Sequence, residues 1–168
     1  MTTVRFDVAP VKERLLAACE VAAVPLDSPG LPTGPGVYLL QHAGTHPLYE
    51  RFGCRPLYVG RSTGLRQRIR THRRTLEQTH DLDPGEFGVV YITTDGRAVA
   101  ALYEELLITH FRPVWNDWSF AGFGNRDPGQ RRRQQQTSPF DRLHPGRGWS
   151  RGPDEPCPVL AACLAAYD

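Results

Sequence analysis

The chain has 168 residues, 40% of them apolar, which is enough for one compact domain over 1–168 and too little for a multi-domain assembly. Its net charge of +2 hides a basic inventory of 19 arginines and one lysine, a bias toward planar contacts with phosphates and bases. No apolar run approaches the roughly 20 residues that cross a bilayer. The sequence also lacks a secretory signal and the cysteine spacing of disulfide or zinc frameworks, so we expect a soluble, cytoplasmic protein with reduced cysteines.

The first half of the chain predicts two helices and two strands. Apolar positions recur at helical spacing in 9–24, and a Pro- and Gly-rich loop follows. Two short β-rich runs, 36–41 and 56–60, are bounded by Gly and Pro and predict paired strands separated by an insertion. The segment 64–79 predicts an amphipathic helix with an arginine coat, because its apolar or semi-polar positions recur at i, i+4, i+7 and i+11.

The second half predicts one more strand and two more helices. A third strand is expected at 86–94, followed by a strong helix at 97–111 that Pro113 ends. The stretch 117–151 is too rich in Gly, Pro and Arg to pack by itself, although its spaced aromatic residues could anchor it. A short closing helix is expected at 158–167, and the fold class is α+β.

Charge is divided into blocks along the chain. Residues 51–80 hold eight arginines and one acid, and 126–151 hold seven arginines and two acids, whereas 81–125 carry seven acids and two arginines. A solvated charged face explains any one such block. Two blocks interleaved with Gln, Asn and aromatic residues favour a polyanionic partner, because arginine forks and amides bind phosphates and base edges.

Glu104 is the residue most at odds with its surroundings. On a helical wheel it falls between Ala100, Leu107 and Phe111, in the middle of the apolar face of the 97–111 helix. Burying an unpaired carboxylate is costly, so the site must supply a cation, a metal or strong donors. A buried ion pair with an arginine is the structural alternative, and a functional-site residue is the favoured interpretation.

Four further residues are candidates for a functional site only when they are considered together. Arg68 and His72 are four residues apart, so they share one face of the 64–79 helix. Tyr38 and Tyr58 each occupy the third position of a predicted strand. Each has an ordinary explanation, since tyrosine is a good strand former, arginine is commonly solvated and histidine is commonly a hydrogen-bonded packing residue.

Five motifs follow one another in a characteristic order: Gly36-Val37-Tyr38, Tyr58-Val59-Gly60, Arg68, Glu104 and Arg112-Pro113-Val114-Trp115-Asn116. In that order and spacing they resemble the GIY-YIG nuclease superfamily over 34–116, with two valines in place of the isoleucines of the motif's name. The resemblance implies a core with a small three-stranded antiparallel sheet flanked by helices, here with an N-terminal helix (9–24) and a Gly/Pro/Arg-rich C-terminal extension (117–151). It also implies a divalent metal, Mg²⁺ or Mn²⁺, and hydrolysis of a nucleic-acid phosphodiester.

The resemblance assigns the metal and the phosphate to two residues. Glu104 would hold the metal through oxygen, which is the ligand atom that Mg²⁺ prefers. Arg68 would fork onto the scissile phosphate and stabilise its negative charge.

The resemblance also assigns the proton chemistry. Tyr38 would be the general base, which requires that the metal and the arginine depress a phenol pKa of about 10. His72 would share the proton transfer with Tyr38, because its unperturbed pKa is about 6.5. Tyr58 would orient water or phosphate, and Asn116 would fix Glu104 or its neighbourhood by hydrogen bonding.

Segments between Gly122 and Trp149 resemble the tail of type II restriction endonucleases of this superfamily that cut the palindrome CCGCGG. That implies a homodimer on double-stranded DNA, since one catalytic centre per chain must cut each strand of a palindrome. It also implies a cognate DNA methyltransferase in the cell, on which the sequence is silent. Which residues contact bases and which contact phosphates stays open. The expected DNA contacts are Arg61, Arg66, Arg126, Arg131, Arg132, Arg133, Gln134, Gln136 and Arg147.

Three other interpretations stay open. A stand-alone repair or structure-specific nuclease would use the same core. A catalytically silent DNA-binding module would keep the fold, but such a module would be expected to have lost some of the six motif residues, all of which are present. The run 131–136 has its own structural alternative, a solvated linker.

Overall fold

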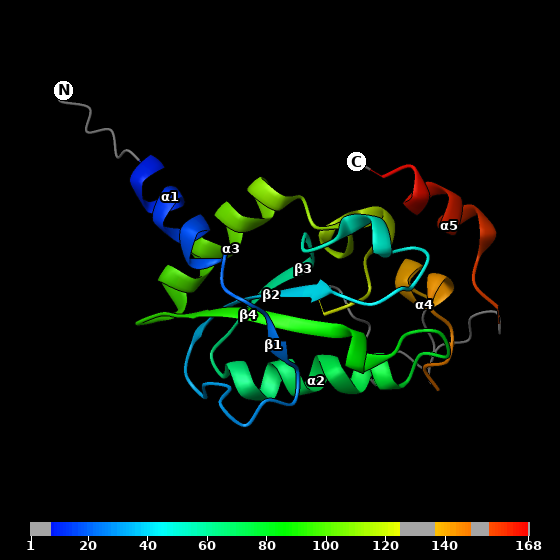
Figure 1. Ribbon diagram of the computed structural model, residues 1–168, viewed down its shortest axis with the longest axis horizontal. Helices are drawn as coiled ribbons and strands as arrows, with labels where there is room; N and C mark the ends of the chain where they lie inside the picture. Colours follow the sequence, from blue (N-terminus) through cyan, green and yellow to red (C-terminus); the bar gives the residue numbers. More distant parts are fainter. Residues whose placement is uncertain (1–7, 125–136, 149–154, 168) are drawn as a thin grey trace.

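The computed structural model describes residues 8–124, 137–148 and 155–167, and Figure 1 shows its helices and strands. The elements in chain order, with η for a 3₁₀ turn, are α1 (Ala9–Ala18), β1 (Val24–Pro25), β2 (Gly36–His42), η1 (Glu50–Phe52), β3 (Pro56–Ser62), α2 (Leu65–Glu77), η2 (Pro84–Glu86), β4 (Phe87–Thr93), α3 (Arg97–Phe111), η3 (Val114–Asn116), η4 (Trp118–Phe120), α4 (Pro139–Leu143) and α5 (Pro158–Ala165).

One antiparallel sheet has the strand order β1-β4-β2-β3. The α+β class is therefore confirmed, but the sheet has four strands and not the three expected. The additional strand, β1, consists of two residues, of which Val24 pairs with Val89 and Pro25 with Gly88 of β4. A pairing this short leaves no periodic signal, which is why the sequence did not indicate it.

Helices cover both faces of the sheet, with α2 below it and α1 and α3 above it in Figure 1. Successive side chains of a strand point to opposite faces. Val37 and Leu39 of β2 accordingly pack with Leu107 of α3, whereas Tyr38 and Leu40 belong to the core that contains the apolar residues of α2. Because β2 is buried on both faces, it reads as an almost uninterrupted apolar run.

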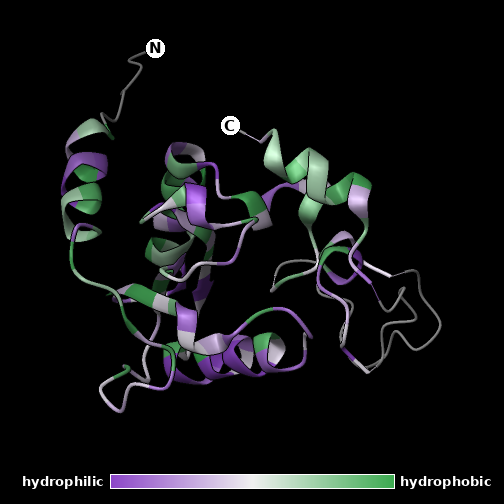
Figure 2. Ribbon diagram, turned by 45° about the vertical axis from the view of Figure 1, so that its right-hand side comes forward, coloured by the Kyte–Doolittle hydropathy of each residue, from purple (hydrophilic) through white to green (hydrophobic). Residues whose placement is uncertain are grey.

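The helix α2 confirms the predicted amphipathic pattern. Leu65, Ile69 and Leu76 are buried, whereas Arg70 and Arg74 are exposed. Figure 2 shows this helix largely hydrophilic on the side turned away from the sheet. The arginine coat is thus presented to solvent along one side of the molecule.

The helix α4 and the 3₁₀ turns were not predicted, and the other differences from the predicted elements lie at element ends. The helix expected over 9–24 ends at Ala18, and only Leu15 of α1 is buried within it. The helix expected at 97–111 has those bounds, and Arg112 ends it in the left-handed conformation (φ 47°) directly before Pro113. Among the described residues, none of the helices is long and apolar enough to cross a membrane.

The C-terminal stretch is anchored by aromatic residues. Phe123, Phe140 and Leu143 are buried in the same cluster as Trp115. Ser138 and Asp141 form a capping box at the start of α4, which satisfies backbone N–H groups there. The described part of 117–151 therefore packs onto the α2 side of the sheet.

Candidate active site

The glycines of the two three-residue motifs make room for neighbouring side chains. Gly60 lies opposite Tyr38 in the β2–β3 ladder, and a Cβ on it would lie 2.6 Å from the Tyr38 hydroxyl and 2.7 Å from Cε1 of Tyr58. A Cβ on Gly36 would lie 2.7 Å from Cδ1 of Leu65, the first residue of α2. Both motifs therefore require glycine because of close approach, since side-chain atoms do not tolerate such distances.

Tyr38 and His72 form a buried pair. The Tyr38 hydroxyl oxygen lies 2.6 Å from Nε2 of His72, and the imidazole stacks on Phe123 with ring centroids 4.6 Å apart. Burial, followed by the charge of Arg68, lowers the pKa of His72 well below its usual 6.5. Burial, with a smaller contribution from Tyr58, raises the pKa of Tyr38. At neutral pH the imidazole is therefore neutral and the phenol protonated, and the imidazole tautomer sets which of the two donates in their hydrogen bond.

Arg68 links this pair to the surface. Its Nε donates to the Tyr38 hydroxyl at 3.4 Å, and its Nη2 donates to the carbonyl oxygen of Gly124 at 2.8 Å. Gly124 has a φ of +65°, and a Cβ there would lie 2.6 Å from Cε1 of His72 and 2.8 Å from the Tyr58 hydroxyl. The backbone at Gly124 therefore lies against Tyr58 and His72, and its carbonyl oxygen accepts a hydrogen bond from one nitrogen of the Arg68 guanidinium.

Tyr58 completes the cluster. Its ring centroid lies 6.1 Å from that of Tyr38 and 5.3 Å from that of His72. Burial raises the pKa of Tyr58, whereas the charge of Arg68 acts in the opposite direction. The phenol is therefore neutral at physiological pH and serves as a hydrogen-bonding group.

Glu104 lies on the other side of β3, on α3, and forms an ion pair with Arg61, whose Nε lies 2.8 Å from Oε2. Its side chain is 24% exposed, and burial raises its pKa although Arg61 opposes this shift. Arg61 is thus the partner that the Glu104 carboxylate requires on this apolar helix face. Mg²⁺ binds through one or two carboxylates together with water and phosphate oxygens, so a partly exposed carboxylate at an open surface has the chemistry that this ion needs.

Asn116 fixes the edge strand of the sheet. Its Oδ1 accepts from the Val59 amide and its Nδ2 donates to the Val59 carbonyl, both at 2.8 Å. Val59 lies between Tyr58 and Gly60. The Asn116 amide was expected to bond to Glu104 or to its neighbourhood, and in the structure it bonds to the Tyr58-Val59-Gly60 motif and not to Glu104. The amide thereby satisfies backbone groups on the open side of β3.

A surface hollow of about 330 Å³ lies beside Glu104 and Arg68. Arg97, the first residue of α3, lines it and was not among the expected site residues. Arg97 precedes Glu104 by two helical turns and so shares its side of α3, a spacing that would have indicated it. The described lining consists of Arg61, Ser62, Thr63, Arg68, Arg97 and Ala100.

Arg147 lies elsewhere than expected for a DNA contact. Its guanidinium is fully buried, pairs through Nε with Asp141, donates from Nη2 to the Gly122 carbonyl and lies over the ring of Phe140. The expectation that it contacts DNA is therefore corrected, because a buried cation paired with a carboxylate is part of the interior. Six other expected contacts lie outside the described residues, namely Arg126, Arg131, Arg132, Arg133, Gln134 and Gln136.

A separate group of ligand-type side chains lies between the loop after β2, the loop after α2 and the end of α4. Within the described residues, His46, Asp81 and His144 bring ligand atoms within 4.8 Å of one another. Nδ1 of His144 lies 2.8 Å from Oδ2 of Asp81, and Nε2 contacts the hydroxyl of Tyr49, which accepts from Trp115 at 3.0 Å. Both nitrogens of His144 are thus hydrogen-bonded, so this group serves as a polar link between the three segments.

The sheet, its flanking helices and the clustered motif residues together define a GIY-YIG nuclease domain, a class of metal-dependent nucleases. The model of one family, described as the Eco29kI GIY-YIG domain, matches residues 55–156. This chain belongs to that family.

An excinuclease and a protein of the UvrABC system are among the relatives of this chain. Excinuclease cho of Escherichia coli (strain K12) is 35% identical over 86 residues, which are 51% of this chain and 26% of the relative. UvrABC system protein C of a Synechococcus species is 36% identical over 93 residues, 12% of its length. The chain therefore matches about a quarter or less of these relatives. The magnesium-bound GIY-YIG domain of UvrC from Thermotoga maritima is 21% identical, with a TM-score of 0.36, covering 62% of this chain and 98% of that one.

Proposed function

We propose that this protein is a type II restriction endonuclease that hydrolyses both strands of double-stranded DNA at the palindrome CCGCGG, with Mg²⁺ or Mn²⁺ bound at Glu104. The observation that carries the nuclease activity is the buried contact of Tyr38 with His72 beside Arg68, and the restriction specificity rests on the resemblance of the C-terminal extension. The family match supports the proposal, because residues 55–156 extend well beyond the core at 34–116 into the C-terminal extension.

The proposed proton path uses the Tyr38 hydroxyl and the tautomer of His72 in which Nε2 accepts. Water gives a proton to the hydroxyl oxygen as that hydroxyl gives its own proton to Nε2 of His72, so the phenol never needs to be a free phenolate. The hydroxide formed attacks phosphorus, the bond to the 3′ oxygen breaks, and the departing oxygen takes a proton from solvent. Glu104 would hold a divalent metal, whose positive charge would favour hydroxide and offset the charge growing on the phosphate.

Arg68 couples phosphate binding to this proton transfer. A phosphate oxygen replaces the Gly124 carbonyl on the guanidinium, and the charged acceptor makes a stronger hydrogen bond than the neutral carbonyl. The same phosphate neutralises the cation that lowers the pKa of His72, which makes the imidazole a better proton acceptor when substrate is present.

DNA recognition is assigned to both arginine blocks. We propose that Arg61 and Arg66 hold the backbone near the catalytic core and that the extension (117–151) reads bases, through Arg126, Arg131, Arg132, Arg133, Gln134 and Gln136. Arginine forks suit the guanines of a G·C-only site. A homodimer places one such centre on each strand, with a cognate DNA methyltransferase protecting the host's own sites.

A second candidate function is incision in DNA repair. It is favoured by one observation, the 35% identity to excinuclease cho. Both candidates use the same cluster, and they differ in whether sequence or altered DNA structure selects the bond.

Digestion of a long, fully sequenced, unmethylated DNA distinguishes them. The purified protein is incubated with Mg²⁺ or with EDTA, and fragment ends are sequenced. Discrete metal-dependent ends within CCGCGG support the restriction enzyme. Nicking, smearing or cutting confined to damaged or branched DNA would overturn it in favour of repair, and no metal-dependent cutting at all would overturn both.

A further inference from the structure

Three surface hollows adjoin one another along α2. The first lies beside Glu104, the second shares Ser62, Thr63 and Arg68 with it, and the third shares Gly64, Gln67 and Thr71 with the second. They measure about 330, 420 and 400 Å³. A continuous groove therefore runs from the start of α3 across the end of β3 and along the outer side of α2.

The lining of this groove suits a chain of phosphates. Among the described residues that line it, none is acidic. Threonine, serine and glutamine side chains lie between the arginines and offer uncharged hydrogen-bond donors. The lining arginines are Arg61, Arg66, Arg68, Arg70, Arg74 and Arg97.

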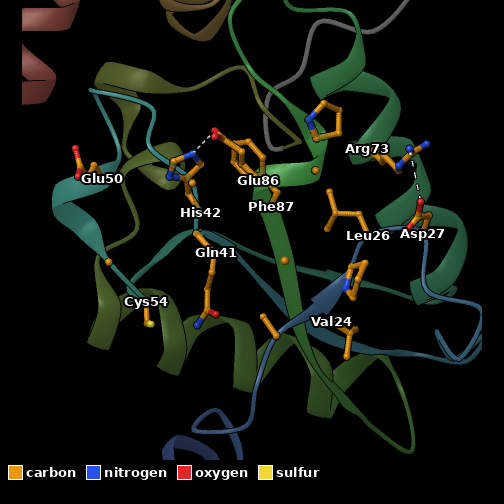
Figure 3. A pocket seen from close by; sticks show the side chains of 18 residues that line it. Val24, Leu26, Asp27, Gln41, His42, Glu50, Cys54, Arg73, Glu86 and Phe87 are labelled. Carbon is orange, nitrogen blue, oxygen red and sulfur yellow. Dashed lines mark hydrogen bonds and ion pairs between the residues drawn. The ribbon is translucent and has the colours of Figure 1, made fainter.

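A hollow at another end of the sheet has the opposite character. It measures about 490 Å³ and lies at the β1–β4 end of the sheet, and Figure 3 shows Asp27, Glu50 and Glu86 among its walls. Arg73 faces this hollow and is paired with Asp27, as the dashed line in Figure 3 marks. Such a lining repels a polyanion, so size alone does not indicate where DNA binds.

The helix α2 carries arginines that line the groove and an arginine that is paired with acidic residues. Arg70 and Arg74 are exposed in the groove, four residues apart and hence about 6 Å along the helix axis. Arg73 lies 2.5 Å from Glu77 and 3.6 Å from Asp27, on a different side of α2. Arg66 donates to the Leu31 carbonyl at 2.7 Å, so it braces the preceding loop while lining the groove.

We propose that this groove holds the sugar-phosphate backbone of one DNA strand, continuing from the scissile phosphate at Arg68 along α2 to Arg74. This proposal rests on the proposed nuclease function and adds the path of the strand. From Arg68 to Arg74 the helix rises about 9 Å. One strand of B-form DNA advances 3.4 Å along its axis per nucleotide, and its phosphates are at least that far apart, so the groove covers about two phosphates on one side of the cut.

The salt dependence of DNA binding tests the groove without requiring cleavage. A CCGCGG duplex is bound in EDTA between 50 and 200 mM salt by the wild type, by Arg70→Ala/Arg74→Ala and by the matched variant Arg73→Ala. Removal of one arginine that neutralises a phosphate lowers the slope of log affinity against log salt by about 1. The slope is expected to fall by about 2 in the double variant and to stay unchanged in Arg73→Ala.

Ethylation of individual phosphates then locates the strand. About two consecutive phosphates on one side of the scissile bond are expected to block binding by the wild type when ethylated, and the outer of these is expected to have no such effect in the double variant. Equal slopes for the double variant and Arg73→Ala would overturn the groove while leaving cleavage intact. Wild-type protein that neither binds nor cuts the duplex would instead overturn the nuclease function on which the groove rests.

Discussion

The hydroxyl of Tyr38 on β2 lies 2.6 Å from Nε2 of His72 on α2, and both side chains are buried. Strand and helix are joined at this point by one hydrogen bond. Burial keeps the imidazole neutral and the phenol protonated. The cost of burying these polar groups is offset by their mutual hydrogen bond and by the bond from Arg68 to the Tyr38 hydroxyl.

Substitution of Tyr38 by Phe tests the relay. We expect Tyr38→Phe to lower the single-turnover cleavage rate by about 10²- to 10⁴-fold with DNA binding unchanged, because the proton path is removed and the ring is kept. The acid limb of the wild-type pH–rate profile is expected to have its midpoint below 6.5, since the pKa of His72 is lowered in the folded state. A midpoint at or above 6.5, or a fast Tyr38→Phe variant, would exclude His72 as the proton acceptor.

Gly60→Ala tests the close approach of the two motifs. The added methyl would lie 2.6 Å from the Tyr38 hydroxyl, so Tyr38 must move. We expect the cleavage rate to fall at least about tenfold. We also expect the free energy of unfolding to fall by about 1–3 kcal/mol, because the site becomes overpacked. Gly34→Ala is the matched control, because a Cβ there meets nothing within 4 Å among the described residues. Cleavage assays and thermal unfolding measure both effects, and equal behaviour of the two variants would contradict this explanation of the motif.

Arg68→Lys separates charge from geometry. Lysine keeps the positive charge but cannot contact the Tyr38 hydroxyl and a phosphate oxygen with one planar group. We expect the cleavage rate to fall about 10²- to 10³-fold while affinity for DNA and its salt slope stay close to those of the wild type. Near wild-type cleavage by Arg68→Lys would show that positive charge alone suffices at this position.

The stability of the fold is expected to depend on pH through two buried histidines. Burial lowers the pKa of both His72 and His144 in the folded state, so the unfolded state binds more protons below pH 6.5. The free energy of unfolding should therefore be constant above about pH 7 and fall below 6.5, by about 1 kcal/mol per pH unit for each histidine. Urea unfolding at pH 7.5 and 5.5 measures this, and an unchanged midpoint would contradict it.

The local elements could be predicted because each carries a periodic signal. The bounds of α3 follow from its apolar spacing and from Pro113, and the arginine coat of α2 follows from the positions of Ile69 and Leu76. The strand β1 could not be predicted, since its pairing with β4 depends on segments distant in sequence. The 3₁₀ turns are three residues each, too short to leave a periodic signal. The same holds for Gly124, whose carbonyl reaches Arg68 only in the folded chain.

Individual side-chain roles divide in the same way. Glu104 was predictable because a carboxylate on an apolar helix face demands a partner, but the identity of that partner, Arg61 on β3, depends on how α3 packs against the sheet. Arg147 shows the reverse case. Its place in an arginine-rich sequence suggests exposure, whereas the structure pairs it with Asp141 inside the protein. Composition therefore predicts the partner class of a segment better than the role of one arginine.

Cleavage of a short duplex that contains one CCGCGG site tests the central claim most directly. Wild-type protein and Glu104→Gln are compared with Mg²⁺ and with EDTA, and both strands are followed in time while binding is measured in parallel. We predict metal-dependent cutting of both strands by the wild type, and binding without cutting by Glu104→Gln. Cleavage by Glu104→Gln at the wild-type rate, or by either protein in EDTA, would contradict the assignment of this site.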